Sequence, residues 1–177
     1  MIPAAAVRAP AAALVFALVL LSGCGSGAPA PDTSPTPSPG PTAQTALLGG
    51  GQGAFERRLG ELRGRPVVVN QWASWCRPCR VEFPFFQRLA RRYQGRVAFL
   101  GINSLDSRDN AAEFLRSFPT PFPHFFDPDG SVARLIGGGR AFPTTAFYTS
   151  DGRLNFTRLG SYATEAKLVA DIERYAL

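Results

Sequence analysis

The sequence predicts an α/β fold in which a central mixed β-sheet is covered by helices on both faces. An apolar run at 67–69, a helix-like stretch and a second apolar run at 97–102 give the order strand, helix, strand. Such a crossover is right-handed and makes its two strands parallel. Two later strand-like runs flank Ser150-Asp151-Gly152, a turn signal that adds an antiparallel hairpin. Parallel and antiparallel strands with intervening helices together predict the layered sheet.

The first part of the domain is predicted to contain a leading element, a strand and a long helix. Residues 55–62 are weakly helical, and 67–72 form the first central strand. The helix is expected from about residue 76 to 93, because its apolar positions recur every four residues, the spacing of one helix face. Those positions are Val81, Phe85, Leu89 and Tyr93. Pro84 interrupts the helix and should kink it.

The second part continues with shorter elements. In chain order the sequence predicts a strand at 96–103, a helix at 109–117 capped by Ser107 or Asp109, an irregular stretch or short strand at 118–126, a turn at 127–130, a short helix at 131–136, a hairpin of 144–149 and 154–159, and a closing helix at 164–175 capped by Thr164. The phenylalanines between 114 and 126 are expected in the core.

The N-terminal residues are predicted to be an export signal and a tether. Residues 1–23 contain a single charge and an apolar run at 11–21 that is too short to span a bilayer as a helix. Residues 24–53 are rich in Pro, Ser, Thr and Gly, which predicts a disordered tether. The folded domain is therefore expected at 54–177.

Cys24 ends the apolar signal in the stretch Leu21-Ser22-Gly23-Cys24, which resembles the lipobox of bacterial lipoproteins. The resemblance implies that Cys24 is lipidated and anchors the protein to the membrane, since more than one lipid chain gives a stable anchor. The alternative is an ordinary cleaved signal with an incidental cysteine. The expected location is the cell envelope, at the extracytoplasmic face of a bacterial cytoplasmic membrane.

The formal net charge is +6, and the basic residues are scattered along the chain. The sequence contains no nucleic-acid motif and no alternation of aromatic and basic residues, so no nucleic-acid partner is expected. A solvated basic surface, or attraction to an anionic membrane, accounts for the charge.

The pair Cys76 and Cys79 carries the chemistry. Two cysteines with two residues between them, at the start of a helix, suit reversible disulfide formation, because the unpaired N–H groups there favour a thiolate. A closed zinc site needs about four ligands, and the chain offers only Cys24 and His124 besides the pair. A c-type haem site needs His at position 80, which is Arg80. A peroxiredoxin site needs Thr or Ser at position 73, which is Ala73. No cofactor other than the redox-active disulfide is expected.

From about residue 62 onward, the chain resembles the thioredoxin fold of the TlpA/ResA-like membrane-tethered thiol–disulfide oxidoreductases. The resemblance rests on the stretch from Asn70 to Cys79, on Glu82 and Pro84, and on the loop Phe142-Pro143-Thr144-Thr145, whose proline is cis in that family. It also implies an insertion at about 104–130, between the active-site helix and the cis-proline loop. The sequence departs from the family pattern at Asn70, Gln71 and Phe142, which leaves the fine substrate preference open. Asn70 stands where cytosolic thioredoxins have a buried Asp, and Gln71 where this family usually has an aromatic residue.

The resemblance and the chemistry assign roles to the site residues. Cys76 is expected to be the exposed attacking thiolate, with Arg77 and Arg80 lowering its pKa. Cys79 is the resolving thiol, and Glu82 is its base unless it is merely a surface glutamate. The residues expected to bind the substrate are Trp75, Arg77, Pro78, Phe142, Pro143 and Thr144. His124 is expected to be hydrogen-bonded or exposed, without a redox role.

Three functions remain open from the sequence. The first is a disulfide reductase fed by a CcdA/DsbD-like membrane thiol–electron transporter, with exported proteins such as apocytochrome c as substrates. The second is a thiol oxidase that introduces disulfides into exported proteins, which Arg77 favours because a stabilised thiolate makes the disulfide more oxidising. The third is a tethered binding module without catalytic activity. By the resemblance to the TlpA/ResA-like family, the Trp-Cys-x-Pro-Cys setting of Trp75 to Cys79 and Glu82 favour the reductase.

Overall fold

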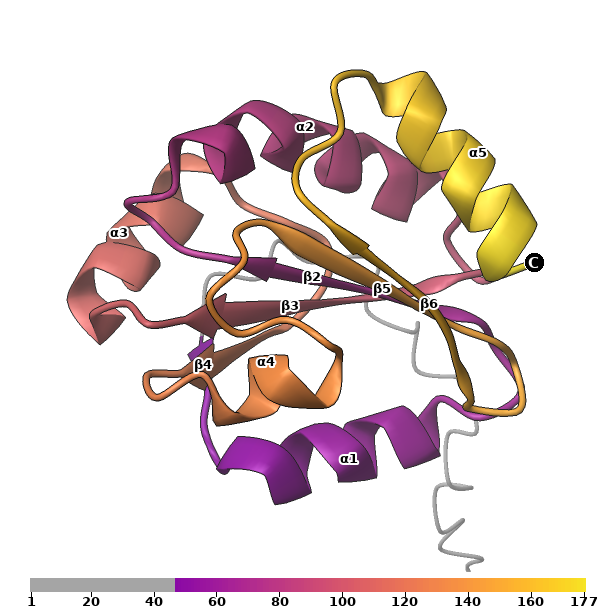
Figure 1. The fold of residues 1–177 in the computed structure, drawn as a ribbon, viewed down its shortest axis with the longest axis horizontal. Coiled ribbons are helices and arrows are strands. Elements are labelled where there is room, and N and C mark those ends of the chain that lie inside the picture. The colour runs from indigo at the N-terminus through magenta and orange to yellow at the C-terminus, as the bar shows by residue number, and fades with distance from the viewer. Residues whose placement is uncertain (1–46) are drawn as a thin grey trace, which may run out of the picture. The chain divides into compact units, whose positions relative to one another are not determined.

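Six strands and five helices form the part of the protein that a computed structural model describes, residues 47–177 (Figure 1). In chain order they are β1 (Leu47–Leu48), α1 (Gly51–Glu61), β2 (Val67–Trp72), α2 (Arg77–Arg92), β3 (Ala98–Ser104), α3 (Arg108–Ser117), β4 (His124–Asp127), α4 (Ser131–Leu135), β5 (Thr144–Tyr148), β6 (Leu154–Leu159) and α5 (Glu165–Tyr175). The predicted elements from 55 onward are all present, with boundaries that differ by a few residues at most for the regular helices and strands.

The strands form one mixed sheet in the order β1-β4-β3-β2-β5-β6. β2 pairs in parallel with β3, and β3 with β4, whereas β5 runs antiparallel to both β2 and β6. The predicted mixed sheet is therefore confirmed, and β2, which leads to the cysteine pair, is one of its two central strands. The segment expected to be an insertion supplies α3 and β4.

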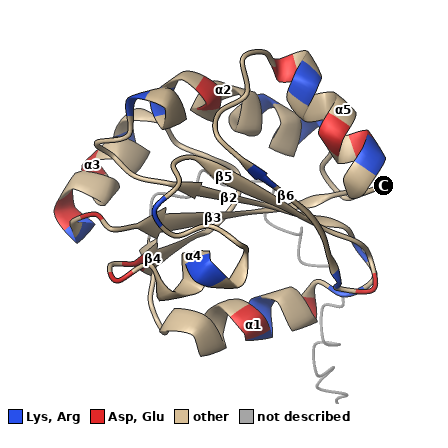
Figure 2. Ribbon diagram, in the orientation of Figure 1, with Lys and Arg blue, Asp and Glu red and all other residues tan. Residues whose placement is uncertain are grey.

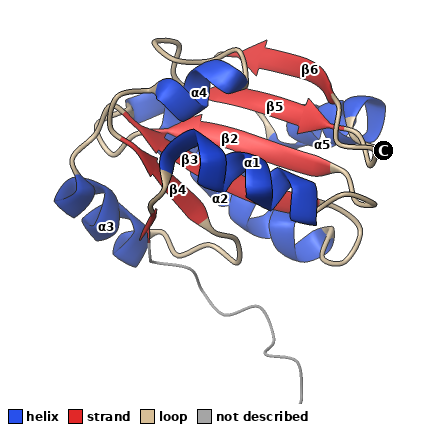
Figure 3. Cartoon of the chain, turned by 90° about the horizontal axis from the view of Figure 1, so that it is seen from below, coloured by secondary structure: helices blue, strands red, loops and turns tan. Residues whose placement is uncertain are grey.

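Helices cover both faces of the sheet, as predicted. α1 and α4 lie on one face, and α2 and α5 on the other (Figures 1 and 3). The alternation of side chains along β2 explains the two cores: Val67 and Val69 pack with residues of α1 and α4, whereas Val68 packs with residues of α2 and α5. A third cluster, next to the cysteines, joins Trp72 and Phe83 to α3.

The predicted end of the tether at residue 53 is wrong. Leu47 and Leu48 pair in parallel with β4, and α1 begins at Gly51. The folded domain thus includes residues that the sequence predicts to be tether. The prediction fails because a two-residue strand and a helix start in a Gly-rich stretch give almost no sequence signal. The predicted export signal and the lipidation of Cys24 lie outside the described residues and stay predictions.

The predicted apolar face of the active-site helix is partly wrong. Leu89 and Tyr93 are buried, but Val81 is 62% exposed and Phe85 only half-buried. A step of four residues turns 400°, so a strict four-residue repeat drifts around the helix instead of staying on one face. The buried positions of α2 mix steps of three and four and are Cys79, Glu82, Phe83, Phe86, Leu89 and Ala90.

Candidate active site

The cysteine pair lies where β2 ends and α2 begins. Cys76 is the N-cap residue of α2, and its Sγ accepts a hydrogen bond from the backbone N–H of Cys79 (3.2 Å). Arg77 and Pro78 occupy the first helical turn, where proline is tolerated because its missing N–H would have no helical partner. Cys76 and Cys79 are joined by a disulfide. The helix start therefore directs the backbone N–H of Cys79 toward the sulfur of Cys76, which favours negative charge there.

The expectation of an exposed Cys76 needs correction. In the disulfide form Cys76 is only 3% exposed, and Cys79 is fully buried. Trp72, Ala73 and Phe83 pack around the two cysteines and cover them. Of the two cysteines, Cys76 is the one that retains some exposure to solvent, so it remains the one that a substrate is expected to approach.

Asp106 fixes the loop that precedes Cys76. Its carboxylate accepts hydrogen bonds from the backbone N–H (2.6 Å) and the hydroxyl (2.8 Å) of Ser74, and from the side-chain amide of Asn103 (2.9 Å). Asp106 is not among the residues predicted from the sequence, because it follows a different strand, 32 residues after Ser74. An acidic residue directly after a parallel strand was the available signal, since such strand ends meet at one edge of the sheet.

Trp75 and Phe142 form an apolar rim beside the disulfide. Trp75 is 58% exposed, its ring centroid lies 4.9 Å from that of Phe142, and its indole N–H donates to the carbonyl of Leu105 (3.0 Å). The Phe142–Pro143 peptide bond is cis, as predicted. The Thr144 hydroxyl donates to the carbonyl of Ala141 (2.9 Å) and is buried within the loop.

Glu82 is fully buried, so it is not a surface glutamate. One carboxylate oxygen accepts from the side-chain amide of Asn70 (3.1 Å), and the other accepts from the backbone N–H of Tyr162 (2.8 Å). Burial, which disfavours the charged form, raises the pKa of Glu82 to about 7 against the opposing effect of these two hydrogen bonds. Glu82 can therefore both take up and release a proton near neutral pH, one helical turn from Cys79.

The two arginines beside the cysteines differ in their surroundings. Arg77 is exposed at the start of α2. Arg80 donates from Nε to the carbonyl of Ser74 (2.9 Å), and its guanidinium lies 5.3 Å from the ring centroid of Phe114. The side chain of Arg80 thus braces the loop before Cys76 in addition to adding positive charge.

His124 is hydrogen-bonded and buried, one of the two outcomes expected for it. Its Nδ1 accepts from the indole N–H of Trp72 (3.0 Å), so Nε2 carries the proton and faces the hydroxyl of Thr120 (2.7 Å), which in turn donates to the carbonyl of Phe122 (2.9 Å). Burial lowers the pKa of His124 to about 3. His124 is therefore a neutral support for Trp72, which packs against the cysteines.

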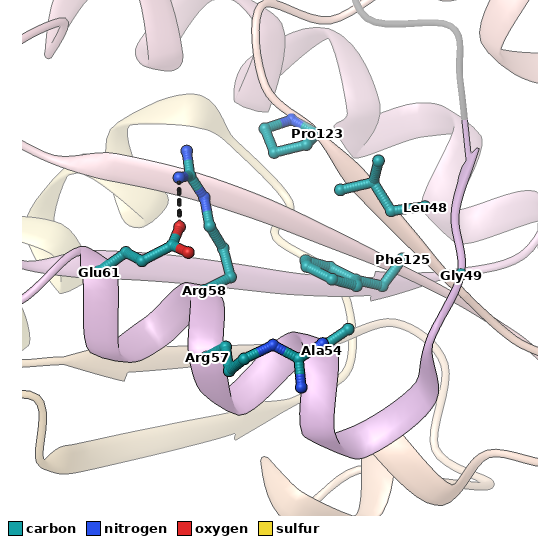
Figure 4. Close-up of a pocket in the computed structure, with 8 residues that line it drawn as sticks. All are labelled: Leu48, Gly49, Ala54, Arg57, Arg58, Glu61, Pro123 and Phe125. Atoms are coloured by element: carbon teal, nitrogen blue, oxygen red, sulfur yellow. Dashed lines mark hydrogen bonds and ion pairs between the residues drawn. The ribbon is translucent and has the colours of Figure 1, made fainter.

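A cavity of about 580 Å³ lies on the opposite face of the sheet from α2, between α1 and the edge formed by β1 and β4 (Figure 4). Its apolar floor includes Phe125 and Pro123, and Arg58 at its wall is paired with Glu61 (2.9 Å). None of its lining residues belongs to the predicted site.

Two further features of the described residues bear on function. Residues 47–177 contain no group of three or more His, Cys, Asp and Glu side chains that could hold a metal ion. Within the same range, no helix is both long enough and apolar enough to cross a membrane.

Comparisons with known proteins agree with this geometry. The thiol:disulfide interchange protein CycY of Rhizobium leguminosarum bv. viciae is 35% identical over 100 residues, which is 56% of this chain and 52% of that protein. The thiol-disulfide oxidoreductase ResA of Geobacillus thermodenitrificans is 32% identical over 111 residues, covering 62% of this chain and 63% of that protein. The chain thus spans between half and two thirds of the length of these relatives.

The fold also has solved counterparts. The structure of MTB dsbF in its mixed oxidized and reduced forms superposes with a TM-score of 0.59 at 29% identity, covering 64% of this chain and 83% of that one. The model of the AhpC/TSA family matches residues 38–157, well over half of the chain. With its thioredoxin-like fold and its CycY-like and ResA-like relatives, the chain belongs to the AhpC/TSA family, on the TlpA/ResA-like side of it.

Proposed function

We propose that this protein is an extracytoplasmic protein thiol–disulfide oxidoreductase that acts mainly as a disulfide reductase. The observation that carries the proposal is the Cys76–Cys79 disulfide at the start of α2, with the buried carboxyl of Glu82 one turn along the same helix. The relatives named thiol:disulfide interchange protein and thiol-disulfide oxidoreductase support it.

The proposed reaction has two exchange steps. In the reduced protein, the Cys76 thiolate attacks one sulfur of a substrate disulfide, which forms a mixed disulfide and releases the other substrate sulfur as a thiolate. The Cys79 thiol then gives its proton to Glu82 and attacks the Cys76 sulfur, which restores the Cys76–Cys79 disulfide and releases the second substrate thiolate. Two electrons pass from the protein to the substrate. A membrane thiol–electron transporter of the CcdA/DsbD-like type is the proposed donor that returns them.

The geometry suits each step. The N–H of Cys79 and the helix start stabilise negative charge on Cys76, so Cys76 is the better nucleophile and leaving group. Glu82 is buried and its pKa is near 7, so its carboxylate is available to accept the Cys79 proton at neutral pH. By the resemblance to the TlpA/ResA-like branch, exported proteins such as apocytochrome c are the proposed substrates.

The test is to trap the mixed disulfide. A Cys79→Ser variant lacks the resolving thiol and should accumulate a covalent adduct through Cys76 with a disulfide substrate, whereas Cys76→Ser should form none. The experiment uses the full chain carrying Cys24→Ser, so that no third thiol competes. Failure of Cys79→Ser to form an adduct, with the fold intact, contradicts the proposal.

A thiol oxidase is the second candidate, because Arg77 and the helix start both favour the reduced Cys76 thiolate and so raise the reduction potential. Equilibration in graded thiol/disulfide buffers, followed by the fluorescence of Trp72 and Trp75, measures that potential. A value at or below roughly −220 mV supports the reductase, and one near roughly −120 mV supports the oxidase.

We also propose a lipid anchor at Cys24. The support is its position at the end of the apolar segment, in the Leu21-Ser22-Gly23-Cys24 context. Expression in a bacterium fed a labelled fatty acid tests it: the wild-type protein should take up label and partition into detergent, and Cys24→Ala should do neither.

A further inference from the structure

A cavity beside the apolar rim has features that the exchange chemistry does not use. Its volume is about 410 Å³, and its lining includes Leu105, Arg134, Gly138, Gly139 and Arg140. Leu105 connects the cavity to the site, because its carbonyl accepts the indole N–H of Trp75. The loop after α4 is a second connection between the cavity and the site, since this loop leads from the cavity directly to the rim residue Phe142.

Gln71 fixes the wall of this cavity. Its fully buried side-chain amide donates to the carbonyl of Gly139 (2.7 Å) and accepts from the N–H of the same residue (3.0 Å). A Cβ at Gly138 would lie 2.1 Å from the Gln71 side-chain oxygen, so this arrangement requires glycine at that position. Gln71 is one of the positions at which the sequence departs from the family pattern. The departure thus has a structural consequence: a buried polar clamp that holds the residue just before Arg140.

The charge at the cavity is positive. Basic residues stand on α4 and on the loop that follows it (Figure 2), and these are Arg134 and Arg140, both exposed. Arg134 donates to the backbone carbonyl of Asp129 (3.0 Å), which orients its guanidinium. The ion pairs among residues 47–177 include neither arginine. The one acidic residue in the lining, Asp129, accepts the N–H of Ser131 with its carboxylate (3.0 Å).

We propose that this cavity is a subsite for an acidic side chain of the polypeptide substrate, bound by Arg134 and Arg140 while the substrate cysteine is joined to Cys76. The inference rests on the proposed function. Guanidinium groups match the two oxygens of a carboxylate, so a Glu or Asp is the side chain that these residues recognise best. Arg140 stands two residues before the rim residue Phe142 on the same loop, so the acidic residue should lie only a few positions from the substrate cysteine.

The test compares matched peptides that differ in one residue. Each peptide carries a single cysteine activated as a mixed disulfide with thionitrobenzoate, and a Glu or a Gln three positions before or after it. The protein is the full chain with Cys24→Ser and Cys79→Ser, reduced at Cys76. Attack of the Cys76 thiolate on the peptide sulfur forms the protein–peptide disulfide and releases thionitrobenzoate, a good leaving group whose absorbance gives the rate.

We expect the Glu peptide to react roughly three- to tenfold faster than the Gln peptide on at least one side of the cysteine, as attraction to two exposed cations allows. The ratio should fall toward one at high salt, because exposed charges are screened. It should also fall toward one in Arg134→Gln/Arg140→Gln. A control with the same charge change, Arg57→Gln/Arg65→Gln, removes two exposed arginines on α1 and at the amino end of β2, and should keep the wild-type ratio.

Equal rates for the Glu and Gln peptides overturn the inference and leave the proposed function intact. A preference that persists without Arg134 and Arg140, or that disappears equally in the control variant, also overturns it, because the effect would then come from the overall field of the protein. If no peptide reacts with Cys76, the proposed function itself fails.

Discussion

Asn70 donates a hydrogen bond from its side-chain amide to a carboxylate oxygen of Glu82 at 3.1 Å, inside the protein. The amide can donate to a charged or a neutral carboxyl without adding charge of its own. Tyr162 supplies a second donor through its backbone N–H. Glu82 is therefore held in place in both protonation states, which suits a group that must accept a proton and later lose it.

Replacing Glu82 by Gln should slow the resolving step. A Gln side chain keeps the size of Glu but cannot accept the Cys79 proton, so release of substrate from the mixed disulfide should fall on the order of 10- to 100-fold at pH 7. This decrease in rate is at or below the low end of the range for general-base catalysis. A thiol loses its proton more readily than a hydroxyl or water does, so it depends less on a base. Stopped-flow measurement of substrate thiol release reports the step. Glu56→Gln, an exposed change on α1, is the control and should react like wild type.

The same carboxyl should make stability depend on pH. The pKa of Glu82 is raised from 4.5 to about 7, so the folded protein binds a proton that the unfolded chain loses between these values. The stability from this proton is fully present below about pH 4.5 and is lost as pH rises to about 7. Relative to Glu82→Gln, the wild-type free energy of unfolding should therefore fall by roughly 3 kcal/mol across this range. Denaturant unfolding of the oxidised proteins measures it, and a difference that stays constant with pH contradicts the buried titration.

His124 should produce the opposite pH trend. Its pKa is lowered from 6.5 to about 3, so only the unfolded chain takes up a proton as the pH falls below about 6.5. The wild type should therefore lose stability relative to His124→Gln by up to roughly 1.4 kcal/mol per pH unit below that point. The two trends partly cancel between pH 4.5 and 6.5, so each must be measured as a difference from its own variant. A wild-type-minus-variant difference that does not change below pH 6.5 contradicts a neutral buried His124.

The secondary structure around the cysteines could be predicted from the sequence, whereas the side-chain contacts that hold the cysteines and their loop in place could not. β2 has the predicted start and end, because the apolar run at 67–69 follows a proline and leads within a few residues to a helix start, which is a strong local pattern. The hydrogen bond from Ser74 to Asp106 and that from Trp72 to His124 join residues 32 and 52 positions apart. Such contacts follow from the pairing and order of the strands, which local patterns do not contain. The burial of Glu82 could not be predicted for the same reason, since it depends on the distant loop that carries Tyr162.

Replacing Asn70 by Asp should couple two buried carboxyls. The new carboxylate would lie where an amide now donates to Glu82, so at neutral pH the pair must share a proton or repel. We expect the pH at which substrate release becomes fast to move upward by about one unit or more. The free energy of unfolding at pH 8 should fall by roughly 2–4 kcal/mol. Gln94→Glu, an exposed amide-to-carboxylate change, controls for the added charge. An unchanged pH profile in Asn70→Asp would show that Glu82 does not set the rate of release.

Replacing Gln71 by Leu should loosen the loop before Phe142 without affecting the cysteines directly. Leu keeps much of the buried volume but leaves the N–H and carbonyl of Gly139 without their partner, so the free energy of unfolding should fall by roughly 1–3 kcal/mol. Hydrogen exchange should locate the change, with faster exchange at Gly139 and its neighbours than in wild type and unchanged exchange in the interior of α2. Because the clamp holds the residue next to Arg140, the Glu-over-Gln preference of the activated peptides should also shrink. If Gln71→Leu loosens the loop but keeps the wild-type preference for the Glu peptide, Arg140 does not need the Gln71 clamp to bind an acidic side chain.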